Sequence, residues 1–77
     1  MEPSWPSVHG MLMNMTTAQL KQLRRDWFSG CLGGASRKGD MAAQMVTQLR
    51  YWWRLPDGYG RERVRNVLRD VGMGEGQ

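Results

Sequence analysis

The stretch DMAAQMVTQLRYWWR, residues 40–54, decides the fold that the sequence predicts. Its apolar side chains recur at helical spacing and form one arc when projected at about 100° per residue. The centre of this arc is made by Met41, Met45, Leu49 and Trp52, and Ala42, Val46 and Trp53 widen it. Asp40 is a good N-cap, and Pro56 biases Leu55 away from helical geometry. We therefore predict an amphipathic helix over residues 40–54.

A second helix is predicted upstream, over about residues 16–29. Thr16 has the properties of an N-cap, and Gln19 three positions later completes a capping box. Met15 is placed to pack on Leu20 as a hydrophobic staple, and Gly30 suits the C-cap. The apolar stripe of this helix consists of Leu20, Leu23 and Trp27, with Phe28 beside it.

A third helix is predicted downstream, over about residues 61–71. The turn Pro56 to Gly60 precedes it, and Gly72 suits its end. Its buried stripe is expected to consist of Val64, Val67, Leu68 and Val71. No strand alternation or repeat is visible, so the fold class is all-α.

The predicted organisation is a three-helix domain over residues 16–72, with an extended arm at 1–15 and a frayed tail at 73–77. The arm is expected to be extended because Pro3, Pro6 and Gly10 interrupt any helical period. The segment 30–39 is glycine-rich and should be a surface linker. At 77 residues the core is only marginally sufficient, so self-association into a homo-oligomer is compatible with the sequence.

Composition restricts the class of function. The formal charge is +4 and the isoelectric point is near 10, which predicts attraction to nucleic acid, an anionic membrane surface or an acidic protein. A single cysteine and a single histidine exclude the usual zinc patterns and favour a reducing cytoplasm. No paired carboxylates or activated nucleophile are evident, so we expect no catalytic residue, no metal and no cofactor. The first fifteen residues have no apolar run that would span a membrane, so neither export nor membrane insertion is expected.

The most informative feature for function is a run of six arginines between Arg50 and Arg69, interleaved with aromatic residues. Arginine presents a planar fork of donors that fits phosphates, carboxylates and base edges. Arg61, Arg65 and Arg69 recur every four residues and repel one another by about 0.2–0.5 kcal/mol per pair, which a negatively charged partner would offset. A solvated basic face with local ion pairs is the alternative.

The sequence also suggests how the residues of this run would divide their roles. Helices 40–54 and 61–71 around a short turn are compatible with a helix-turn-helix. In that motif Arg50, Arg54 and Arg69 would contact phosphates, and Arg61, Arg63 and Arg65 would contact bases. Arg63 and Asn66 face further out and could reach base edges in a major groove. Trp52 is expected in the core, whereas Tyr51 and Trp53 are candidates for exposure. In the linker, Arg37 and Lys38 add to the positive field. The candidate binding residues are Arg37, Lys38, Arg50, Tyr51, Trp53, Arg54, Arg61, Arg63, Arg65, Asn66 and Arg69.

These patterns predict a non-catalytic, nucleic-acid-binding or regulatory protein, with DNA favoured over RNA. Its size would suit a phage or mobile-element accessory protein. The alternative is a protein-interaction module that docks on an acidic surface of a larger host or viral protein and inhibits or modulates it. Exposed tryptophan, tyrosine and arginine side chains, which are enriched at interface hot spots, favour this alternative. Binding at a membrane surface is disfavoured, because the basic residues flank an apolar stripe that the domain itself needs.

Overall fold

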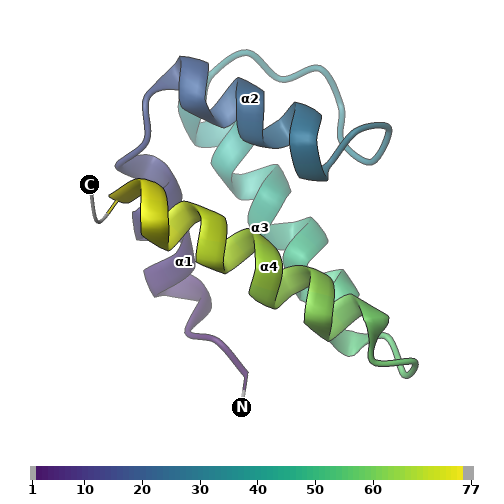
Figure 1. Ribbon diagram of the computed structural model, residues 1–77. Helices are drawn as coiled ribbons and strands as arrows, with labels where there is room; N and C mark the ends of the chain where they lie inside the picture. The colour runs from purple at the N-terminus through teal and green to yellow at the C-terminus, as the bar shows by residue number, and fades with distance from the viewer. Residues whose placement is uncertain (1, 76–77) are drawn as a thin grey trace.

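Four helices make up most of the computed structural model, which describes residues 2–75 and the side chains of residues 2–72 (Figure 1). They are α1 (Trp5–Met13), α2 (Thr17–Trp27), α3 (Lys38–Arg54) and α4 (Tyr59–Glu75). No strand occurs in the described part of the chain, so the all-α prediction is confirmed.

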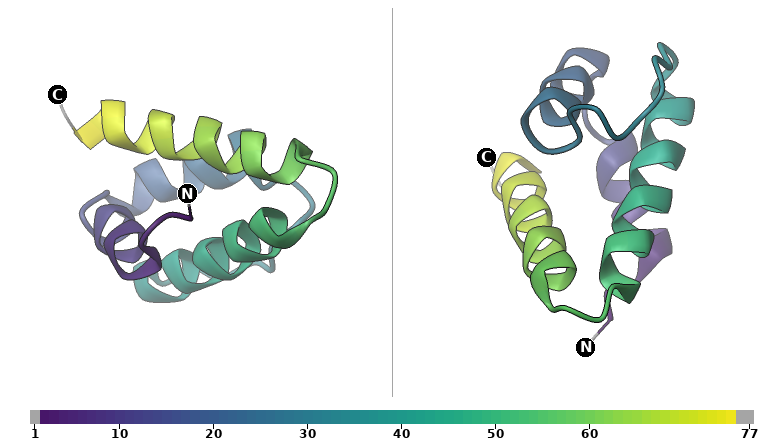
Figure 2. Two further views of the ribbon diagram at one scale, coloured as in Figure 1. Left: turned by 90° about the horizontal axis from the view of Figure 1, so that it is seen from below. Right: turned by 90° about the vertical axis from the view of Figure 1, so that its right-hand side faces the viewer.

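The helices α3 and α4 form an antiparallel hairpin around which the other two are arranged. They meet at the short turn after Arg54 and diverge away from it, and α2 lies across their open end (Figure 2). The helix α1 packs against both α3 and α4. Because α4 folds back along α3, the two helices form an αα-hairpin.

The core fills the space between these helices and has α3 as its largest contributor. Six residues of α3 are buried, and Trp52 stacks on Phe28 at a ring-centroid distance of 5.2 Å and an interplanar angle of 14°. The predicted core position of Trp52 is confirmed. The other helices bury side chains against this centre: Val8, Leu12, Leu20, Leu23, Val64, Val67 and Val71.

The expectation of an extended arm over residues 1–15 is wrong, because Trp5–Met13 is a helix. Pro6 stands in the first turn, where a proline costs no intrahelical hydrogen bond. Gly10 is exposed and leaves the packed side unaffected. Val8 and Leu12 lie one turn apart and are both buried, with Trp5 half-buried beside them. Packing of this apolar face therefore outweighs the low helix propensity of the segment.

Some predicted helix boundaries are confirmed, and others differ from the observed ones. The capping box is present: the Gln19 N–H donates to Thr16 Oγ1 at 3.1 Å, and the Thr16 N–H donates to Gln19 Oε1 at 2.8 Å. The helix α2 ends at Trp27, earlier than predicted, and Gly30 adopts its left-handed φ of 77° beyond the C-cap Phe28.

The predicted ends of the two longer helices also change. The helix α3 starts at Lys38, so Asp40 is in its first turn and is not the N-cap. Its end at Arg54, before an extended Leu55, is as predicted. The helix α4 starts two residues earlier than predicted and continues past Gly72 to Glu75, so the expected stop at Gly72 is wrong. Of the predicted frayed tail, residues 76 and 77 lie outside the described residues.

Gly60 permits the close contact between α3 and α4. It is buried in the first turn of α4, and a Cβ atom at this position would overlap the backbone carbonyl of Trp52. The preceding Gly58 has a φ of 80°, a left-handed conformation that favours glycine. The Gly58 carbonyl then accepts the first helical hydrogen bond of α4, from the Glu62 N–H at 3.2 Å. These two glycines set the geometry of the hairpin.

Replacing Gly60 with alanine is therefore expected to destabilise the protein by about 3 kcal/mol, because backbone must move to relieve the overlap. The matched control is Gly72→Ala in the same helix, where an added Cβ meets no atom within 4 Å. That variant should be neutral or more stable by about 0.5 kcal/mol, since alanine favours the helix. Urea unfolding followed by circular dichroism measures both. Equal stability of the two variants would contradict the close helix contact.

Candidate functional site

Two arginines of α4 lie over the indole of Trp53. The guanidinium carbon of Arg61 is 5.3 Å from the ring centroid and that of Arg65 is 5.9 Å from it. Trp53 itself is only 7 % exposed, so its predicted availability as a binding side chain is wrong. The hairpin explains the difference, because α4 turns back over the side of α3 on which Trp53 lies. The indole serves as a support that orders two guanidinium groups at the surface.

Arg63 is also folded back onto the protein, which corrects the expectation that it points outward toward base edges. Its guanidinium carbon lies 4.6 Å from the centroid of the Trp52 ring, and its Nη2 donates to the Trp27 carbonyl at 2.5 Å. The Trp27 indole Nε1 in turn donates to Asp70 Oδ2 at 2.8 Å. Arg63 therefore connects α4 with both α2 and α3. Asn66, predicted to face outward with it, is half-buried.

Basic side chains donate to carbonyls in the last turns of three helices. Lys38 Nζ donates to the Met13 carbonyl at the end of α1 at 3.1 Å, and Arg61 Nε donates to the Trp53 carbonyl near the end of α3 at 3.3 Å. Arg63 does the same for α2. The last carbonyls of a helix have no intrahelical partner, and the helix end carries partial negative charge. Part of the basic composition is therefore explained by the fold.

The remaining arginines of the predicted surface make no such hydrogen bond. Arg37, Arg50, Arg54 and Arg69 are exposed, and within the described residues they form no hydrogen bond or ion pair. Tyr51, between Arg50 and Arg54, is 59 % exposed. A shallow cavity of about 250 Å³ on the outer side of α3 is lined by Thr47, Arg50, Tyr51 and Arg54.

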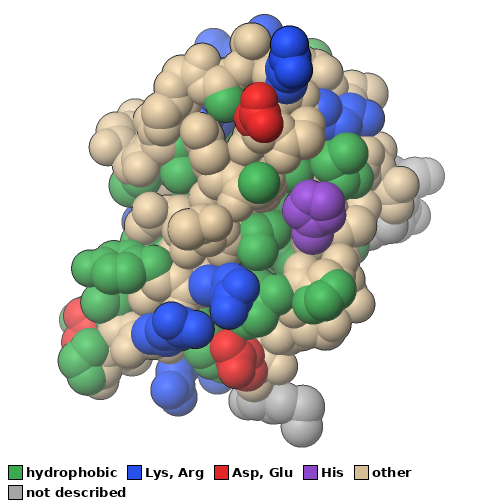
Figure 3. Space-filling model, turned by 180° about the vertical axis from the view of Figure 1, so that it is seen from behind, with side chains coloured by type: hydrophobic (Ala, Val, Ile, Leu, Met, Phe, Trp, Pro, Cys, Tyr) green, Lys and Arg blue, Asp and Glu red, His purple; other side chains and the backbone are tan. Residues whose placement is uncertain are grey.

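We call Arg50, Tyr51, Arg54, Arg61 and Arg65 the basic face. Arg50 lies three residues before Trp53 and four residues before Arg54. These spacings place Arg50 beside both residues on the surface of α3. The basic face therefore joins the outer side of α3 to the two guanidinium groups over Trp53. In the view from behind, Lys and Arg side chains lie among large hydrophobic ones (Figure 3). Arg69 is exposed and continues the row of Arg61 and Arg65, one turn further along α4.

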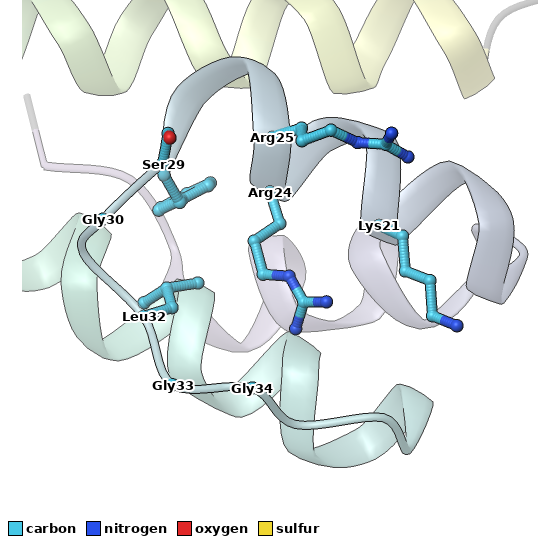
Figure 4. Close-up of a pocket in the computed structure, with 9 residues that line it drawn as sticks. Lys21, Arg24, Arg25, Ser29, Gly30, Leu32, Gly33 and Gly34 are labelled. Carbon is cyan, nitrogen blue, oxygen red and sulfur yellow. The ribbon is translucent and has the colours of Figure 1, made fainter.

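A second basic surface, which the sequence patterns above do not predict, lies between α2 and the linker. It is a cavity of about 360 Å³ lined on one side by Lys21, Arg24 and Arg25 (Figure 4). The spacing of these three residues, i, i+3 and i+4, is the signal that could have predicted it. The predicted linker residues Arg37 and Lys38 do not line this cavity.

The described residues contain no group of three or more His, Cys, Asp or Glu side chains that could hold a metal ion. Within the same residues, no helix has the length and apolar character needed to cross a membrane. Comparisons with protein families, curated proteins and solved structures found no match to this chain. The geometry of the two basic surfaces is therefore the basis for a functional proposal.

Arg63→Ala is expected to destabilise the fold by about 1.5 kcal/mol, because it removes a charge-assisted hydrogen bond and a cation–π contact. The control is Arg69→Ala on the same helix. It removes the same charge where the guanidinium has no hydrogen-bond or ion-pair partner among the described residues, and it should change stability by less than about 0.5 kcal/mol. Urea unfolding monitored by tryptophan fluorescence measures both variants. Indistinguishable midpoints would show that Arg63 has no structural role.

Proposed function

We propose that the protein is a non-catalytic nucleic-acid-binding protein that uses the basic face. The observation that carries the proposal is the exposed Tyr51 ring between the guanidinium groups of Arg50 and Arg54, which form no hydrogen bond or ion pair with other described residues. Aromatic rings between cations suit a strand whose bases stack while its phosphates are neutralised. A purely solubilising surface has no need of an exposed aromatic ring at its centre.

The ordered guanidinium groups of Arg61 and Arg65 support the same proposal. Each is held over Trp53, so less side-chain freedom is lost when a phosphate binds. Arg61 uses its Nε for the Trp53 carbonyl, and its Nη groups remain available for an external oxygen.

The geometry favours a single strand over a duplex as the ligand. Arg63 and Asn66, for which the sequence predicts contacts to base edges in a major groove, are held against the protein or half-buried. Tyr51 instead presents a ring on which an unpaired base can stack. We propose single-stranded DNA as the first ligand to test, with RNA of the same sequence beside it.

The second candidate is an interaction module for an acidic protein surface. Tyrosine and arginine side chains are enriched at interface hot spots, and the basic face contains both. This candidate has the same charge complementarity but requires no stacking of bases. The two functions differ in salt dependence and in how they respond to loss of the Tyr51 ring.

Binding of the protein to a single-stranded DNA oligonucleotide is expected to weaken steeply with salt. Changing Arg50 or Arg54 to glutamine should reduce the slope of log K against log salt concentration by about 0.7 for each phosphate that is no longer neutralised. The matched control is Arg37→Gln, because Arg37 is also exposed but lies at the N-cap of α3, the end opposite Arg50 and Arg54. Fluorescence anisotropy at several salt concentrations measures the slopes. The proposal is wrong if all three variants behave alike or if no oligonucleotide binds at low salt.

Tyr51→Leu is expected to lower affinity for the oligonucleotide by about tenfold, because stacking on an aromatic ring is worth on the order of 1–3 kcal/mol per base. Tyr51→Phe should retain most of the affinity, since the ring is kept. The control is Tyr59→Leu, because Tyr59 is 78 % exposed and lies outside the cavity beside Tyr51. Equal effects of Tyr51→Leu and Tyr59→Leu would show that bases do not stack on Tyr51 and would favour the acidic-protein candidate. That candidate predicts that a protein partner is still recovered with this protein after nuclease treatment.

A further inference from the structure

The cavity between α2 and the linker combines three cationic side chains with backbone of a glycine-rich loop. Lys21, Arg24 and Arg25 come from α2, and the opposite wall includes Gly33 and Gly34. In the close-up, Lys21 and Arg24 point to the side on which the linker runs, while Arg25 extends along the helix (Figure 4). No aspartate or glutamate lines this cavity.

The backbone of the loop offers hydrogen-bond donors on the other side of the cavity. Gly33 and Gly34 form no hydrogen bond with other described residues, and both are exposed. The position of the loop is fixed by Arg24, whose Nη1 donates to the Ala35 carbonyl at 2.7 Å. An oxyanion in the cavity would therefore meet cationic side chains on one wall and the exposed backbone of Gly33 and Gly34 on the other.

The local charge exceeds what the end of α2 requires. The last turn of α2 carries partial negative charge, and Arg24 and Arg25 are both placed to offset it. Lys21 lies one turn earlier and adds a third positive charge at the cavity. The one acidic residue of α2, Asp26, accepts a hydrogen bond from Gln22 Nε2 at 2.9 Å and does not line the cavity. A ligand with negative charge would relieve the repulsion among the three cations.

We propose that this cavity binds the phosphate group of a nucleotide-sized phosphomonoester. A phosphomonoester carries close to two negative charges at neutral pH and has three strong acceptor oxygens, which suits a cavity lined by three cationic side chains and no carboxylate. The volume of about 360 Å³ exceeds the need of a phosphate ion alone and is in the range of small-molecule sites. The half-buried Leu32 supplies apolar surface for the rest of the ligand. This site does not overlap the basic face.

The test is a titration of the whole ¹⁵N-labelled chain, followed by amide NMR, with inorganic phosphate, adenosine 5′-monophosphate and adenosine. Phosphate and the monophosphate should shift the Gly33 and Gly34 signals, and the monophosphate should bind more tightly. Adenosine should leave both signals unchanged. Shifts by adenosine equal to those by the monophosphate, or phosphate-induced shifts that do not include Gly33 and Gly34, would overturn the proposal.

Variants of the lining residues give the second readout. Lys21→Gln and Arg25→Gln should each weaken binding of the monophosphate by about fivefold, since each removes one charge-assisted hydrogen bond. Arg69→Gln, with the same change of charge on α4, should alter affinity by less than about twofold if the effect is local. Equal effects at all three positions would reject a defined site. Arg24 is not changed because it holds the linker through the Ala35 carbonyl. Neither outcome tests oligonucleotide binding by the basic face, which is a separate site.

Discussion

The hydrogen bonds from basic side chains to the last carbonyls of α1, α2 and α3 are the interaction on which the rest of this structure depends. Each is made by a residue later in the chain: Lys38, Arg63 and Arg61. They satisfy acceptors that have no intrahelical partner, and they connect each helix end to another helix. In a domain with a small core, such links position helices that apolar contacts alone would hold less precisely.

Trp52 shows how the polar links and the apolar core reinforce one another. One face of its indole stacks on Phe28, the guanidinium of Arg63 lies over its ring, and its backbone carbonyl approaches Gly60. Residues from the end of α2 and from α4 thus converge on one residue of α3. Any change that moves α4 away from α3 would disturb the contact of Arg63 with Trp52 and the hydrogen bond of Arg63 to the Trp27 carbonyl together.

The arginines therefore divide into two groups with different physical roles. Arg24, Arg61 and Arg63 each use at least one donor for a carbonyl of the chain itself. Arg50 and Arg54 have no such partner among the described residues and flank an exposed tyrosine. The proposed nucleic-acid binding depends on the second group, with Arg61 and Arg65 as ordered neighbours. Composition alone does not separate these groups, since every arginine contributes the same formal charge.

Much of the fold is predictable because local signals agree with tertiary packing. The capping box at Thr16, the arc of α3 and the stripe of Val64, Val67 and Val71 all appear as expected. The helix α1 is not predicted because Pro6 resembles an interruption, although the first turn of a helix tolerates proline. The burial of Trp53 and the contacts of Arg63 with Trp52 and the Trp27 carbonyl depend on where α4 returns along α3. A single helix projection contains no information about that packing.

The most direct test is the mobility of the individual guanidinium groups, measured by side-chain ¹⁵N NMR. We predict slow hydrogen exchange and restricted rotation for Arg63, with Arg24 and Arg61 partly protected, and fast exchange for Arg50, Arg54 and Arg69. Addition of a single-stranded oligonucleotide should slow the hydrogen exchange of Arg50 and Arg54 and leave that of Arg37, at the other end of α3, unchanged. Uniformly fast exchange of all the arginines in the free protein would contradict the conclusion that basic side chains hold the helix ends.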